Sequence, residues 1–182
     1  MRNFVLSTCL LIGVSGLKAQ LPDLGQVKIT ITPVGQGNTG DVPAGSYVFS
    51  AASGSNQGYS WSSGKEYIDC SYGTDFTRSK PINITGSFRI WHPQAGKFLM
   101  RNGADGDDPP DLATFRLIID NSVVLSGDKK GTSGTITVTS LGPGKNGWVT
   151  GSFDVTVGDS PDPNAILHLF RVTGEFKLNS AQ

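Results

Sequence analysis

Three stretches of the chain carry nearly the same heptapeptide: Ile84-Thr-Gly-Ser-Phe-Arg-Ile90, Val149-Thr-Gly-Ser-Phe-Asp-Val155 and Val172-Thr-Gly-Glu-Phe-Lys-Leu178. In each copy, aliphatic residues, Gly and Phe alternate with Thr, Ser or Glu and a charged residue. Alternation with a period of two residues is typical of a β-strand that has one buried and one exposed face. The repeat therefore predicts three related strands whose aliphatic residues, Gly and Phe point inward.

The glycine on the buried side of each copy needs a structural reason, because Gly weakens a strand unless a close approach of other atoms requires it. These glycines are Gly86, Gly151 and Gly174. We expect a large aromatic ring from a neighbouring strand to fill the space that each missing side chain leaves. The candidate rings stand two positions further along each copy: Phe88, Phe153 and Phe176.

Similar alternating segments fill most of the chain, and no segment has the periodicity of an amphipathic helix. Polar segments separate them, including a flexible loop expected at 53–65 and an acidic loop at 102–111. About nine or ten strands in one domain of residues 20–182 predict an all-β fold, an antiparallel β-sandwich that is jelly-roll-like or immunoglobulin-like. We expect strands at 27–33, 45–52, 66–72, 84–90, 96–101, 114–120, 122–126, 132–141, 147–157 and 165–178.

Residues 1–19 have the features of a cleaved signal peptide. Arg2 supplies a basic start, residues 4–14 are apolar, and small residues lead up to Ala19. The apolar run is too short to span a bilayer, so we expect no transmembrane segment. With cleavage after Ala19, the mature protein is expected to be secreted or periplasmic.

The charge of the mature chain argues against polyanionic partners. Cleavage after Ala19 removes Arg2 and Lys18, two of the 15 basic residues, and leaves 13 basic and 15 acidic residues, a net charge of −2. Such a chain has no electrostatic footprint for nucleic acid or for an anionic membrane surface. Of the two cysteines, Cys70 alone remains after cleavage, so no intrachain disulfide can form, and we expect it to be a buried apolar residue.

No catalytic or cofactor motif stands out in the sequence. The two histidines, His92 and His168, have no Cys, Asp or Glu neighbours at the spacing of metal ligands. No pair of carboxylates is recognisable as a glycosidase pair. A hydrolase would need two ionisable residues that converge in a cleft, and no such pair can be recognised in the sequence. An enzyme is therefore the less favoured class.

The acidic loop at 102–111 is a candidate Ca²⁺ site. Carboxylate and amide oxygens are the ligands that Ca²⁺ prefers, and two glycines in the loop permit tight backbone turns. The spacing does not fit an EF-hand, and the alternative is a solvated loop whose charges only keep it soluble. The candidate ligands are Asn102, Asp105, Asp107, Asp108 and Asp111.

A second candidate site comes from two tryptophans that extend the polar side of the heptapeptides. Trp91 follows the first copy and Trp148 precedes the second, so both are expected on the outward face of their strands. Aromatic rings beside hydrogen-bonding groups are how non-catalytic β-sandwiches commonly bind sugars, because rings stack on the apolar faces of sugars. The candidate contact residues are Trp91, Trp148, Arg89 and Asp154, with Tyr59 and Trp61 from the 53–65 loop.

Three interpretations of these aromatic residues stay open. They can pack structurally at a sheet edge, stack on a glycan or another small ligand, or bury a contact with a protein partner, where Trp and Arg are frequent hot spots. We expect an exported, non-catalytic binding module, with a carbohydrate favoured over a protein partner. The alternative is a structural or adhesive subunit, and the sequence leaves the oligomeric state open.

Overall fold

The computed structural model describes residues 25–35, 42–50, 55–61, 67–74, 82–100, 112–128, 131–142, 147–159 and 168–179. Within these ranges the chain forms eleven β-strands and no helix, which confirms the predicted all-β class. The described residues thus include no helix of the length and hydrophobicity that a membrane span requires. The predicted signal peptide at 1–19 and the acidic loop at 102–111 lie outside the described residues.

One strand was not expected from the sequence. Residues 55–61, in the middle of the predicted 53–65 loop, form a strand that pairs with the next one along its whole length, so the loop prediction is wrong there. The strands are β1 (Gln26–Val34), β2 (Gly45–Ser50), β3 (Ser55–Trp61), β4 (Tyr67–Thr74), β5 (Ile84–Trp91), β6 (Gly96–Met100), β7 (Leu112–Ile119), β8 (Val123–Ser126), β9 (Ser133–Leu141), β10 (Trp148–Gly158) and β11 (Leu169–Asn179).

All eleven strands belong to one continuous sheet with the order β2-β1-β11-β10-β9-β6-β7-β5-β4-β3. β8 pairs with both β7 and β10, which closes β10, β9, β6, β7 and β8 into a five-strand barrel. A sandwich of two separate sheets is therefore not confirmed. Purely antiparallel pairing is wrong at one place, because β6 and β7 are parallel.

The parallel pair follows from the turn after β5. His92, with a left-handed φ of 44°, and Pro93 direct the chain out of β5. β6 does not form a hairpin with β5. It pairs with β9 instead, and its last two residues pair in parallel with the first two residues of β7.

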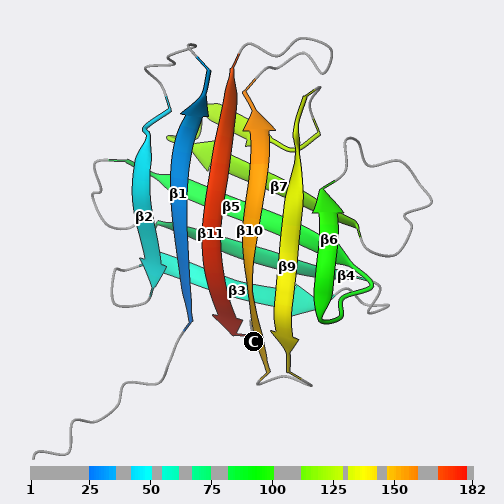
Figure 1. Cartoon of the computed structure of the whole chain (residues 1–182). Coiled ribbons are helices and arrows are strands. Elements are labelled where there is room, and N and C mark those ends of the chain that lie inside the picture. The colour runs from blue at the N-terminus through cyan, green and yellow to red at the C-terminus, as the bar shows by residue number, and fades with distance from the viewer. Residues whose placement is uncertain are drawn as a thin grey trace, which may run out of the picture.

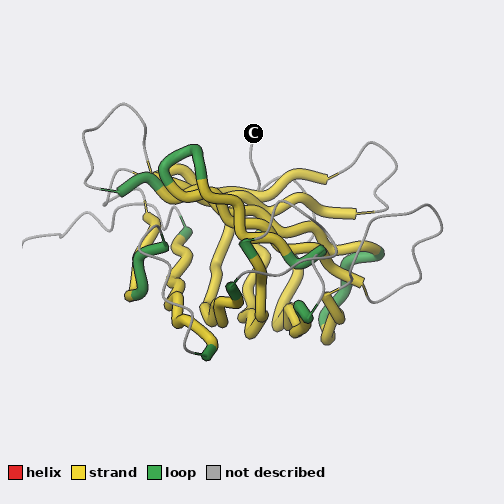
Figure 2. The backbone as a smooth tube through the Cα atoms, turned by 90° about the horizontal axis from the view of Figure 1, so that it is seen from above, coloured by secondary structure: helices red, strands yellow, loops and turns green. Residues whose placement is uncertain are grey.

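The continuous sheet folds into two layers whose strands cross (Figure 1). β2, β1, β11, β10, β9 and β6 run side by side in the front layer, and β7, β5, β4 and β3 cross behind them. Seen from above, the strands of the first layer appear end-on while those of the second run across the view (Figure 2). The apolar side chains of both layers point into the space between them and form one core.

The three heptapeptides alternate as predicted: their aliphatic and Phe side chains are at most 3% exposed. Between β10 and β11, Gly151 lies opposite Phe176, and Gly174 lies opposite Phe153. A Cβ atom added to either glycine would collide with the ring opposite it. The predicted packing of a Phe ring over a Gly is therefore confirmed for β10 and β11, where each strand supplies a ring that covers the glycine of the other.

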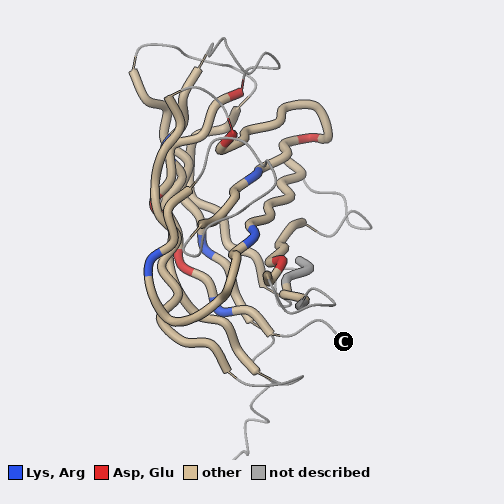
Figure 3. The backbone as a smooth tube through the Cα atoms, turned by 90° about the vertical axis from the view of Figure 1, so that its right-hand side faces the viewer, with Lys and Arg blue, Asp and Glu red and all other residues tan. Residues whose placement is uncertain are grey.

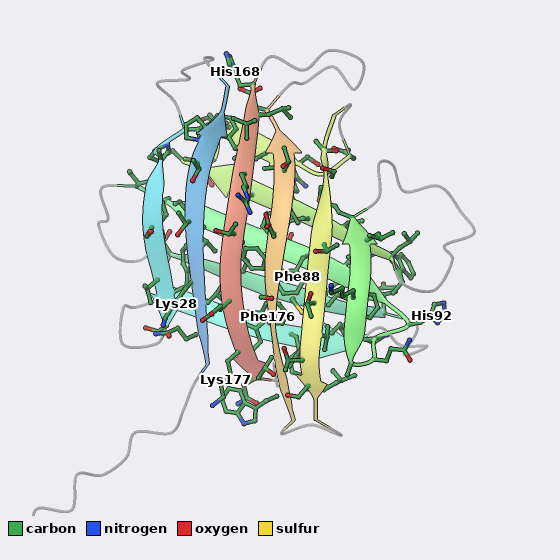
Figure 4. All side chains as sticks on the ribbon, viewed as in Figure 1. Lys28, Phe88, His92, His168, Phe176 and Lys177 are labelled. Atoms are coloured by element: carbon green, nitrogen blue, oxygen red, sulfur yellow. The ribbon has the colours of Figure 1, made fainter. Side chains whose placement is uncertain are left out.

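At the third glycine, Gly86, the ring is a different one. Tyr72 of β4 lies directly opposite and covers it, in place of a Phe. Phe88 packs across the core, with its ring centroid 4.8 Å from that of Phe176 and 6.1 Å from that of Phe153. Phe88 and Phe176 therefore join the two layers in the middle of the molecule (Figure 4).

Replacing Gly174 by Ala should destabilise the fold by about 1–3 kcal/mol, because the added Cβ would overlap the Phe153 ring and the carbonyl oxygen of Lys28. Ser152→Ala, on the exposed side of β10, is the matched control and should change the free energy of unfolding by less than about 0.5 kcal/mol. Urea unfolding of the mature protein measures both. A Gly174→Ala variant as stable as the wild type would contradict the reciprocal packing.

Cys70 should be unreactive in the folded mature protein. It is fully buried, as predicted, and burial raises the pKa of its thiol, with a further contribution from the Asp69 carboxylate. The thiolate is the reactive form, so a thiol reagent such as DTNB at about pH 8 should label only the urea-unfolded chain. Stoichiometric labelling of the native protein within minutes would be inconsistent with this buried position.

Candidate ligand-binding site

The structure separates the two predicted tryptophans. Trp91 ends β5 and Trp148 begins β10, and both side chains are partly buried. The inner sides of these strands meet in the core, where Phe88 of β5 packs near Phe153 of β10. The outward side chains of β5 and β10 therefore point in opposite directions, and each tryptophan belongs to its own surface.

The first surface, here named the β4–β5 cluster, consists of Tyr67, Asp69, Arg89 and Trp91. The register of the two strands places Tyr67 opposite Trp91, and Asp69 opposite Arg89. Alternate residues of a strand point to the same side, and directly opposite residues share that side. All four side chains therefore lie on the outer face of the sheet.

Arg89 holds the cluster together. Its Nε and Nη2 donate hydrogen bonds to the two carboxylate oxygens of Asp69, at 2.7 and 3.0 Å. This bidentate contact fixes the plane of the guanidinium group. The guanidinium carbon also lies 4.0 Å from the ring centroid of Tyr67 and 5.5 Å from that of Trp91, within the range of cation–π attraction.

The two aromatic rings of the cluster contact each other directly. The rings of Tyr67 and Trp91 meet edge to face, with their centroids 4.7 Å apart. This is a favoured geometry for aromatic pairs, because the edge of one ring carries positive and the face of the other negative partial charge. Together with the contacts of Arg89, it gives both rings a defined orientation.

Small polar residues border the cluster on the same face. Ser60 of β3 lies opposite Asp69, and one row further Gly58, Ser71 and Ser87 lie side by side on β3, β4 and β5. The three serines are exposed. Because these side chains are short, the surface beside the cluster is low and exposes hydroxyl groups.

The second surface lies on the opposite face and is more dispersed. Nζ of Lys177 lies 4.5 Å from the ring centroid of Trp148, at the end of β11 labelled in Figure 4. Asp154 stands six residues further along β10, about 20 Å from Trp148 at the usual rise of a strand. There Arg171 donates hydrogen bonds to both of its carboxylate oxygens, at 2.8 and 2.6 Å. This distance is too great for Trp148 and Asp154 to hold one small ligand.

Tyr59 and Trp61, predicted as loop contacts, belong to β3. The register of β3 turns Tyr59 inward, opposite Cys70. Its side chain is 1% exposed, and its hydroxyl donates a hydrogen bond to the carbonyl oxygen of Gly147 at 3.2 Å. Tyr59 is therefore a core residue that ties β3 to the start of β10. The side chain of Trp61 lies outside what the structure describes.

The Ca²⁺ site stays a prediction, because its candidate ligands all lie outside the described residues. These are Asn102, Asp105, Asp107, Asp108 and Asp111. Within the part of the chain that the structure describes, no group of three or more His, Cys, Asp or Glu side chains is placed to hold a metal ion.

The two histidines lie far apart, His168 at one end of the front layer and His92 at the side of the molecule (Figure 4). Nδ1 of His168 lies 2.9 Å from Oδ2 of Asp159, and the backbone N–H of His168 donates to Oδ1 of the same carboxylate at 3.0 Å. These contacts join the end of β10 to the start of β11. They give the histidine–aspartate pair a structural role.

Sequence reasoning identified Trp91 and Arg89 but missed Tyr67 and Asp69. Their outward direction could have been found, because they alternate with the apolar residues Ile68 and Cys70. Their contact with Trp91 and Arg89 could not, because it depends on the register between two strands that are joined by a long connection.

Comparisons of the chain with protein-family models, with curated proteins and with solved structures give no match. A function for this protein has to be inferred from its own residues and their geometry.

The ion pair of Asp154 with Arg171 should make stability depend on pH. The pKa of Asp154 is lowered, chiefly because Arg171 donates hydrogen bonds to its carboxylate. A carboxyl group whose pKa is lower in the folded state stabilises the fold above its unfolded-state pKa, and this contribution is lost as the pH falls through the folded-state value. The wild type should therefore be slightly more stable than Asp154→Asn above about pH 4, and the difference should vanish near pH 2.

Urea unfolding of both proteins at the two pH values measures this effect. The difference should be small, because both side chains are more than half exposed. A difference that is the same at both pH values would contradict the assigned role of the ion pair.

Proposed function

We propose that this chain is an exported, non-catalytic binding module and that the β4–β5 cluster binds a glycan. The observation that carries this proposal is the fixed orientation of the side chains in the cluster. One arginine, held by a bidentate ion pair, contacts two aromatic rings on an outer face of the sheet. No catalytic step is part of the proposal.

The aromatic rings support stacking on a sugar. Tyr67 and Trp91 are partly exposed, and the apolar faces of sugar rings bind to flat aromatic side chains. The contacts with Arg89 orient both rings before a ligand arrives. Such preorganisation favours binding, because less side-chain freedom is lost when the complex forms.

The polar members of the cluster support hydrogen bonding to sugar hydroxyls. The side chains of Arg89 and Asp69 are 37% and 45% exposed, so donors and acceptors stand beside the rings. The exposed Ser60, Ser71 and Ser87 add hydroxyl groups on the same face. A few convergent polar groups next to apolar surface are typical of small-molecule sites.

Export is proposed from residues 1–19, whose basic start, apolar run and small residues are typical of a signal peptide. The mature chain would then act in the periplasm or outside the cell. A glycan ligand suits that location, because surface and extracellular polysaccharides are found there.

A protein partner is the second candidate. An arginine beside Tyr and Trp is also the usual composition of a protein–protein hot spot. A structural or adhesive subunit would use such a surface to contact another chain or a second copy of this one.

The Trp91→Ala variant of the mature protein should lose glycan affinity by at least about tenfold, because its ring supplies stacking surface in the cluster. The measurement is a screen on an array of neutral and acidic glycans, followed by titration of the glycans that bind. Trp148→Ala is the matched control, because it removes the same side chain and a cation–π contact from the opposite face. It should bind like the wild type.

Circular dichroism and thermal melting establish that both variants are folded. Equal affinity of Trp91→Ala and the wild type would exclude the β4–β5 cluster as the binding surface. Absence of glycan binding by the wild type, together with a dimer in light scattering that Trp91→Ala disrupts, would favour the protein-interaction alternative.

A further inference from the structure

One cation on the outer face of β4, β5 and β7 makes no ion pair or hydrogen bond with any other residue that the structure describes. Arg116 of β7 lies opposite Ser87 of β5, two residues along the strand from the pair formed by Arg89 and Thr114. Its side chain is exposed, and among the described residues it makes no ion pair or hydrogen bond. Arg89 and Arg171, in contrast, each hold a carboxylate with two hydrogen bonds.

The charge on this face is therefore unbalanced at Arg116. The described outward residues of β4, β5 and β7 include one acidic residue, Asp69, and two basic ones, Arg89 and Arg116. Asp69 is paired with Arg89, so among the described residues of these three strands no acidic side chain is left to pair with Arg116. Charged residues elsewhere are scattered over both layers (Figure 3). An exposed guanidinium matches the oxygen atoms of a carboxylate or sulfate group.

The register also fixes how far Arg116 lies from the aromatic rings. Trp91 and Ser87 are four residues apart on β5, which corresponds to about 13 Å, and Arg116 follows one strand, about 5 Å, beyond Ser87. The row of Asp69 and Arg89 lies between the aromatic pair and the next row, in which Ser71, Ser87 and Arg116 stand side by side. A ligand that stacks on Trp91 and reaches Arg116 must therefore extend over more than one sugar ring.

We propose that the ligand is an acidic glycan and that Arg116 binds its anionic group, a carboxylate or a sulfate. This inference rests on the glycan-binding function proposed above for the β4–β5 cluster. One sugar ring stacks against Tyr67 and Trp91, the glycan passes over the Asp69–Arg89 pair, and an anionic group of a later ring pairs with Arg116 in the row of Ser71 and Ser87.

Calorimetric titration with three probes tests this assignment: tetragalacturonic acid, its methyl ester and a sulfated galactan tetrasaccharide. At an ionic strength of about 0.05 M, the wild type should bind at least one acidic probe about tenfold more tightly than the neutral ester. Preference for the first or the third probe distinguishes a carboxylate from a sulfate ligand.

Arg116→Gln should lose this preference and keep its affinity for the ester, whereas Arg116→Lys should keep part of the preference, because it retains the charge without the bidentate geometry. The control is Lys97→Gln, which removes an exposed positive charge from β6 in the other layer and should bind like the wild type. Because the Arg116 side chain is exposed, we expect its replacement to leave the fold intact, and thermal melting of each variant verifies this.

Two results would overturn the role of Arg116 and leave the proposed glycan binding intact. In the first, Arg116→Gln retains the full preference for the acidic probe. In the second, all glycans that bind through Trp91 are neutral. Binding of an acidic probe that Trp91→Ala leaves unchanged contradicts the proposed function itself. Absence of binding to every glycan by the wild type overturns both.

Discussion

Phenylalanine rings that pack over glycines set the strand register on which the core and the candidate site are built. Phe176 covers Gly151 and Phe153 covers Gly174, so β10 and β11 fit together in one register. A shift by one residue would turn every side chain of a strand to the other face. Phe88 then packs on Phe176 from the second layer and couples the two layers.

The same kind of contact positions the candidate site. Tyr72 covers Gly86 and thereby favours the register between β4 and β5 that is observed. That register brings Tyr67 opposite Trp91, and Asp69 opposite Arg89. One register of β4 and β5 therefore fixes both the core contacts and the site contacts, because alternate residues of a strand point into the core and toward the surface.

The outward-facing residues of the three heptapeptides differ in their contacts. In the front layer two acidic residues each lie opposite a basic one on a neighbouring strand: Asp154 pairs with Arg171, and Glu175 lies opposite Lys28. In the second layer Arg89 is neutralised by Asp69 but also orients two aromatic rings. Similar inner halves therefore build one core, while the divergent outer halves give the two faces different chemistry.

Alternation with a period of two residues is a local property of the chain. The amino-acid sequence was therefore sufficient to predict the all-β class, the inward side of the three heptapeptides and the burial of Cys70. It could not reveal β3, whose first four residues, 55–58, include no large apolar side chain and form a strand by pairing with β4. The sequence also could not predict that Trp91 and Trp148 face opposite sides of the molecule or that Tyr67 contacts Trp91. These relations depend on register and on the assignment of strands to layers, which long-range packing sets.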